Sequence, residues 1–157
     1  MTPDQQALVS RFDGFLAKIE ERLREIMTEA EQGVLGLIVQ HPTDAMPLGN
    51  AMSGLDHRVR ELKEKIQETW DQQIEPKYSA LDSGGRFLDV GLDQKQDAET
   101  RFDEQWATFK ARANSQFYRN LFGLATEAAK KPVPCTQCGA PLALSDRANS
   151  VSMHCGH

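Results

Sequence analysis

The stretch LVSRFDGFLAKIEERLREIMTEAEQGVLGL, residues 8–37, carries the clearest structural pattern in the chain. Its apolar and small residues recur at steps of three and four, which is the spacing of one face of an α-helix. The steps approach a repeat of roughly 11 residues, which keeps one apolar stripe facing a partner helix with little supercoiling. The stripe consists of Leu8, Phe12, Phe15, Ile19, Leu23, Ile26, Ala30, Val34 and Leu37.

The residues around this stretch supply a start and a stop for the helix. Thr2 can act as the N-cap, because its hydroxyl can accept a hydrogen bond from an N–H group of the first turn. Pro3 suits the first helical position, where no N–H donor is needed. The pair His41–Pro42 predicts the stop, because proline disfavours the helical conformation in the residue before it.

A second run with helical spacing follows a loop that we expect over residues 42–50. Pro76 is expected to interrupt or kink this run, because proline has no N–H group to donate within a helix. The sequence Ser83–Gly85 predicts its end. The apolar residues of the second run are Met52, Leu55, Val59, Leu62, Ile66, Trp70 and Ile74.

A third run is expected to begin between Leu92 and Ala98. It is expected to end at Lys130, because Pro132 and Pro134 cannot both continue a helix. Its apolar and small residues are Phe102, Trp106, Phe109, Ala113, Phe117, Leu121, Leu124 and Ala128.

Three long amphipathic runs joined by short loops predict an all-α fold, an elongated antiparallel three-helix bundle or coiled coil. We expect this bundle to occupy residues 1–131 and a second, smaller module to occupy residues 132–157. The pair of prolines at Pro132 and Pro134 is the clearest sign of a domain boundary in the chain.

The charge of the chain is uneven. The net charge is −5, yet the segment 130–157 is basic, because it holds Lys130, Lys131 and Arg147 against a single acidic residue, Asp146. The helical part therefore carries the whole excess of negative charge. Binding to a phosphate backbone depends on neutralising Lys and Arg side chains, so we do not expect the bundle to bind nucleic acid.

The sequence also predicts the cellular compartment of the protein. The longest apolar run, Val34–Val39, is far shorter than the roughly 20 residues that cross a bilayer. The first residues, Met1–Gln6, lack the basic and apolar regions of a secretory signal. We therefore expect a cytoplasmic protein without a membrane partner, whose cysteines stay reduced.

All three cysteines of the chain lie near its end, in PCTQCGAPLALSDRANSVSMHCGH, residues 134–157. Cys135 and Cys138 form a C-x-x-C-G sequence, in which Gly139 can adopt a positive φ angle and turn the loop around an ion. The residues that follow alternate in the manner of a short β-hairpin, which would return the chain to Cys155.

This segment resembles the zinc ribbons, in which a β-hairpin joins two such loops around one tetrahedral Zn²⁺. The resemblance covers residues 134–157 only, and residues 1–130 resemble no family. It implies a zinc-ribbon-like β-hairpin appended to the bundle, with Cys135, Cys138 and Cys155 as three of the metal ligands.

The fourth ligand is less clearly indicated. A full ribbon would place another cysteine three residues after Cys155, whereas His154 and His157 flank it here. The side chain of His154 would point to the opposite face of an extended strand. Gly156 allows the backbone to bend so that His157 reaches the ion, and we expect a Cys3His site. Water or a residue beyond the chain end are the alternatives.

Other interpretations of these residues find less support in the sequence. A thioredoxin-like redox pair would require a βαβ context, which the sequence does not show. A zinc deaminase would require an H-x-E sequence, but neither His41 nor His57 is followed by one. Ordinary cysteines without a metal remain an alternative. His57 and Glu61 share a helix face that we expect to be solvated rather than metal-binding.

The sequence therefore predicts a non-catalytic, zinc-binding scaffold or adaptor that binds a protein partner, with possible self-association through its helices. A surface for self-association or partner binding would explain why Val34–Val39 is apolar all round, and so would a deeply buried turn. One alternative is a nucleic-acid-associated factor that uses Lys130, Lys131 and Arg147. Another is a zinc metalloenzyme whose metal keeps an open coordination position.

Overall fold

The computed structural model describes residues 1–131, 134, 136–139, 143–147 and 150–154. Helix α1 extends over Pro3–Gln40 and begins as predicted. The Thr2 hydroxyl accepts a hydrogen bond from the Gln5 N–H, and the Gln5 side chain accepts one from the Thr2 N–H. This reciprocal pair is a capping box, which satisfies two donors at the helix start. The predicted stop at His41 is confirmed.

The buried face of α1 is close to the predicted stripe but not identical to it. Leu16 and Ile38 are buried, while the predicted Phe15 and Leu37 are only partly buried. The buried positions differ from the predicted ones because α1 packs against helices on two sides. Its buried face is therefore wider than one line of residues. The buried residues of α1 are Leu8, Phe12, Leu16, Ile19, Leu23, Ile26, Val34 and Ile38.

Helix α2 extends over Met46–Thr69, so the predicted loop over residues 42–50 was too long. The Asp44 carboxylate accepts a hydrogen bond from the Met46 N–H at 2.9 Å and so starts the helix early. Pro47 lies in the first turn of α2. Backbone N–H groups there have no partner within the helix, so a proline costs no hydrogen bond.

The expected interruption at Pro76 takes the form of a π-helical turn, η1, over Trp70–Ile74. The Glu75 N–H donates to the Trp70 carbonyl, five residues back rather than four. The wider turn lets the chain pass the proline, which has no N–H group to donate. Helix α3 then covers Glu75–Leu81.

Helix α4 extends over Phe87–Lys130, so the predicted start between Leu92 and Ala98 was wrong, whereas the predicted end is confirmed. The Asp82 carboxylate accepts hydrogen bonds from the N–H groups of Leu88 at 3.1 Å and Gly84 at 3.2 Å. These bonds, that of Leu88 above all, lower the pKa of Asp82. The carboxylate caps α4 from outside the helix, and periodicity carries no sign of such a cap.

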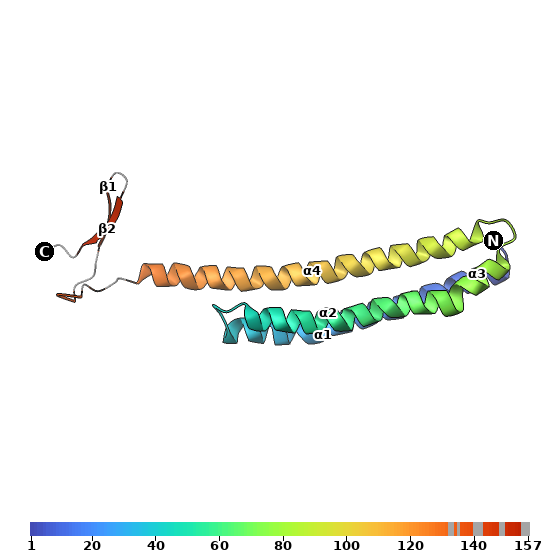
Figure 1. The fold of residues 1–157 in the computed structure, drawn as a ribbon, viewed down its shortest axis with the longest axis horizontal. Helices are drawn as coiled ribbons and strands as arrows, with labels where there is room; N and C mark the ends of the chain where they lie inside the picture. Colours follow the sequence, from blue (N-terminus) through green and yellow to red (C-terminus); the bar gives the residue numbers. More distant parts are fainter. Residues whose placement is uncertain (132–133, 135, 140–142, 148–149, 155–157) are drawn as a thin grey trace. The chain divides into compact units, whose positions relative to one another are not determined.

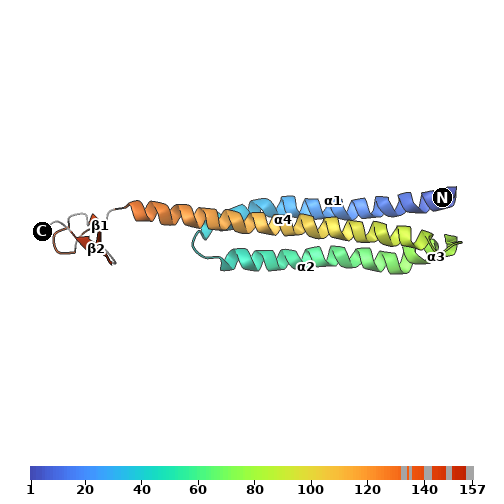
Figure 2. The ribbon, with the colours of Figure 1, turned by 90° about the horizontal axis from the view of Figure 1, so that it is seen from above.

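The first compact unit, Met1–Phe117, is a bundle of three packed helical segments. α1, the α2–α3 segment and α4 lie side by side, with each successive segment reversing direction (Figures 1 and 2). The Arg101 side chain of α4 contacts Glu20 of α1 at 2.8 Å, and Lys63 of α2 pairs with Asp103 of α4. The predicted all-α fold with three packed helices is confirmed.

Aromatic rings hold one end of the bundle together. The ring centroids of Trp70 and Phe12 lie 5.5 Å apart, those of Trp70 and Tyr78 5.8 Å, and those of Tyr78 and Phe87 4.6 Å. These four rings come from α1, η1, α3 and α4. Gly91 of α4 packs against them so closely that a Cβ atom there would lie 2.8 Å from Cη2 of Trp70.

The second compact unit, Tyr118–His157, contains the last turns of α4 and a two-stranded sheet. Strands β1 (Ala143–Arg147) and β2 (Ser150–His154) pair antiparallel. The register places Ala143 opposite His154 and Arg147 opposite Ser150. The division between the two units falls inside α4, and the predicted domain boundary between residues 131 and 132 stays a prediction.

The contact of Gly91 with the aromatic rings yields a prediction. Gly91→Ala is expected to destabilise the protein by about 1–3 kcal/mol, because the added methyl group meets ring atoms on two sides. Gly54→Ala is the matched control, since a Cβ atom there meets nothing within 4 Å. In α2 this change should stabilise the helix by up to about 1 kcal/mol. Urea unfolding measures both effects, and equal stability of the two variants would contradict the packing.

Candidate functional site

The described part of the predicted metal site lies around Cys138. A turn covers Thr136–Cys138, and the Cys138 side chain is exposed and not part of a disulfide. Gly139 has a φ of +73°, the left-handed conformation that the sequence predicts for it. The backbone after Cys138 therefore has the sharp turn that a C-x-x-C-G loop requires.

The two strands pair so that the chain leaves the hairpin next to the point where it enters. The chain enters β1 at Ala143 and leaves β2 at His154, and these two residues are opposite each other in the register. The entry and the exit of the hairpin are therefore neighbours. Cys138 precedes the entry by a few residues, and Cys155 is the residue that follows the exit in the sequence.

Three of the four predicted ligands, Cys135, Cys155 and His157, lie outside the described residues. The ligand set therefore stays a prediction. Within the described ranges, no group of three or more His, Cys, Asp and Glu side chains is placed to hold a metal ion. His57 and Glu61 are both exposed, as expected for a solvated helix face.

One partly buried polar cluster lies between α2 and α4. The Asp56 Oδ1 atom accepts hydrogen bonds from Trp106 Nε1 at 2.6 Å and from Lys110 Nζ at 3.1 Å. The Lys110 ammonium also lies 5.5 Å from the centroid of the Trp106 ring. Burial alone would raise the pKa of Asp56, but these two hydrogen bonds and the charges of Lys110 and Arg60 lower it below its ordinary value.

A second polar chain joins α1, α3 and α4. The Tyr78 hydroxyl donates to Gln94 Oε1, and Gln94 Nε2 donates to Asp13 Oδ1 at 2.8 Å and to the Val9 carbonyl at 3.4 Å. Burial, and next the charge of Asp13, raise the pKa of Tyr78 to about 12. The phenol therefore stays protonated and acts as a hydrogen-bond donor, which positions the helices.

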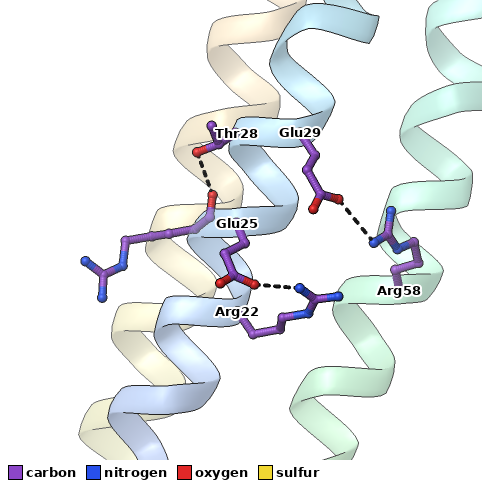
Figure 3. Close-up of polar contacts among 6 residues, drawn as sticks. Arg22, Glu25, Thr28, Glu29 and Arg58 are labelled. Atoms are coloured by element: carbon purple, nitrogen blue, oxygen red, sulfur yellow. Dashed lines mark hydrogen bonds and ion pairs between the residues drawn. The ribbon is translucent and has the colours of Figure 1, made fainter.

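Charged residues on the outer face of α1 form exposed ion pairs. Arg22 pairs with Glu25 within α1, and Arg58 of α2 approaches Glu29 at 3.7 Å (Figure 3). The side chains of Arg22 and Glu25 are about half exposed, at 52% and 50%. Exposed pairs of this kind contribute little to stability.

The apolar run Val34–Val39 turns out to have two faces. Val34 and Ile38 are buried in the bundle, whereas Leu35 and Val39 are 41% and 73% exposed. The run is therefore neither a wholly buried turn nor a wholly exposed surface. A larger exposed apolar group lies on the last turns of α4, where Tyr118, Phe122 and Leu124 are 62%, 74% and 46% exposed.

Sequence reasoning missed the role of Asp56 and of Asp82. Asp56 is an ordinary charged residue of an amphipathic helix, and its partner Trp106 lies far away in the sequence. Only the position of Trp106 on an apolar stripe hinted that its N–H group would need an acceptor. Asp82 stands before a glycine pair, which predicts a turn but not which N–H groups the carboxylate will reach.

Comparisons with known protein families, with characterised proteins and with solved structures found no significant match. None of the described helices combines the length and the apolar composition needed to cross a bilayer.

The lowered pKa of Asp56 predicts a pH dependence. Its stabilising contribution should be present above pH ~4, near the ordinary Asp pKa, and disappear as the pH falls through the lower folded-state value. Asp56→Asn should therefore cost roughly 1 kcal/mol or less at neutral pH, since the group is partly solvated. The cost should shrink on acidification. Urea unfolding of both proteins from pH 7 to pH 3 measures this difference.

Asp97→Asn is the control for this experiment, because it removes an exposed carboxylate from α4. We expect its effect to be small at every pH. A stability difference between the wild type and Asp56→Asn that stays constant from pH 7 to pH 3 would contradict the assignment.

Proposed function

We propose that this protein is a non-catalytic zinc-binding scaffold or adaptor, in which a helical bundle carries a zinc-ribbon-like module that binds a protein partner. The observation that carries the proposal is the turn at Thr136–Cys138, followed by Gly139 at positive φ and by a paired hairpin. This is the backbone order that a zinc ribbon requires.

The residues of the segment fit Zn²⁺ by their chemistry. Cys135, Cys138 and Cys155 would supply three thiolates, the soft ligands typical of structural zinc sites. The hairpin supports the inclusion of Cys155, because its exit at His154 is opposite its entry at Ala143. Bound zinc would supply folding free energy on the order of 10 kcal/mol, which a segment too short for its own core needs.

We assign the fourth ligand to His157. His154 is the last residue of β2 and forms part of the ladder with Ala143. His157 follows Cys155 after Gly156, a residue that permits the backbone to turn. A closed Cys3His site has a structural role, since a catalytic zinc keeps one position for water.

The bundle supports the scaffold part of the proposal. Its buried side chains are mostly apolar, and the polar groups between its helices, such as Asp56 and Gln94, form bonds that position the helices. Such a body can serve as the scaffold, and the module follows the end of α4 in the sequence.

The zinc site predicts a metal content and its dependence on single ligands. The purified protein should contain about one zinc per chain under reducing conditions. Cys138→Ser should lose most of that zinc, because a hydroxyl is a poor replacement for a thiolate. His157→Ala should weaken zinc retention against a competing chelator far more than His154→Ala does. Metal analysis after dialysis measures all four proteins.

Absence of zinc from the reduced wild-type protein would contradict the proposal as a whole. Equal retention by His157→Ala and His154→Ala would contradict the fourth ligand alone. The adaptor role is tested with the same proteins by affinity purification from the native host. A protein partner should be retained by the wild type and by His154→Ala, and lost with Cys138→Ser; retention by all three would contradict a partner site on the module.

A further inference from the structure

The last turns of α4 separate apolar from polar side chains completely. A helix turns by about 100° per residue, so the positions of residues 118–130 around the axis follow from the sequence. All the aromatic, leucine and alanine side chains fall within an arc of roughly 160°, and the polar ones fall outside it. The apolar arc consists of Tyr118, Leu121, Phe122, Leu124, Ala125, Ala128 and Ala129.

The arc lies on the orange part of α4 in Figure 1, and all its side chains except the partly buried Leu121 are exposed. Phe122 is 74% exposed, Tyr118 62% and Leu124 46%, and the three alanines are exposed as well. With aromatic side chains of about 150–250 Å² each, the exposed arc amounts to roughly 400–500 Å². The largest continuous apolar patch on a typical monomeric protein has this size, about 300–600 Å², and is often functional.

We infer that this arc is a self-association surface and that two copies of the chain pair through residues 118–130 of α4. Two copies of the arc would bury roughly 800–1,000 Å² in total, which is the lower limit for a specific interface and the size of a weak one. An apolar surface is complementary to itself, as a two-fold interface requires. The alanines allow the two helices to approach closely, while Tyr118 and Phe122 supply most of the buried area.

The charge distribution favours a second copy over a charged partner. The chain as a whole has a net charge of −5, so most faces of two copies repel each other. The segment 118–130 holds only Arg119, Glu127 and Lys130, and Glu127 and Lys130 form an ion pair at 2.9 Å. Repulsion between two copies is therefore weakest where the apolar arc lies. The small interface predicts a dimer that dissociates on dilution.

Sedimentation velocity of the full chain over a concentration series tests this inference. The wild type should shift from monomer to dimer as the concentration rises. Phe122→Glu should raise the dissociation constant at least about tenfold, because the dimer would bury an unpaired carboxylate. Ala129→Glu, a second change within the arc, should have the same effect.

Two control variants introduce a glutamate at positions outside the apolar arc. Val39 is 73% exposed, which matches Phe122, and Val39→Glu should leave the dimer unchanged. Thr126→Glu lies on the polar side of the same helical turns and should also leave it unchanged. Far-UV circular dichroism should show equal helicity in all variants.

A wild type that stays monomeric, or that owes its association to a protein partner, would overturn the inference. So would a dimer that survives Phe122→Glu and Ala129→Glu, or one that either control abolishes. The inference does not depend on zinc, so the dimer should persist after chelation. Loss of the dimer on chelation would show that the helix face alone is not the interface.

Discussion

The contact between Gly91 and the rings of Trp70 and Tyr78 is the constraint on which the bundle depends. A Cβ atom at residue 91 would lie 2.8 Å from Trp70 and 2.9 Å from Tyr78, so only glycine lets α4 approach this closely. The rings reach this position because the π-helical turn at Trp70–Ile74 takes the chain past Pro76. Phe12 then completes the contact from α1. Phe87, the first residue of α4, stacks on Tyr78 at the same place.

Local rules in the sequence predicted most of the bundle. The steps of three and four identified the three helices, and proline positions identified where two of them end, because both effects act within a few residues. The start of α4 could not be found in this way. It depends on the Asp82 carboxylate reaching the N–H groups of Leu88 and Gly84, which is set by the geometry of the loop. The Asp56–Trp106 bond escaped prediction for a similar reason, because it joins residues far apart in the sequence.

The candidate metal site also has one part that local sequence predicts and another that depends on tertiary structure. The C-x-x-C-G sequence predicted a turn whose glycine can adopt a positive φ angle, and Gly139 has that conformation because turn chemistry is local. Its completion would depend on tertiary structure, since Cys155 and a histidine, which follow the second strand in the sequence, would have to approach Cys138. The pairing of Ala143 with His154 supports that approach, and the proposed zinc ion would provide the free energy that holds it. The bundle needs no such help, because it has an aromatic and aliphatic core of its own.

The central claim is therefore that a self-sufficient helical bundle carries a module whose folding depends on metal. Hydrogen exchange of the full chain, measured by mass spectrometry with zinc and after chelation, tests this claim most directly. Backbone amides of α1, α2 and α4 up to Phe117 should keep their protection, while those of residues 134–157 should lose it when the metal is removed. Equal protection of residues 134–157 in both states would contradict a metal-dependent module. Loss of protection throughout the helices on chelation would contradict the independence of the bundle.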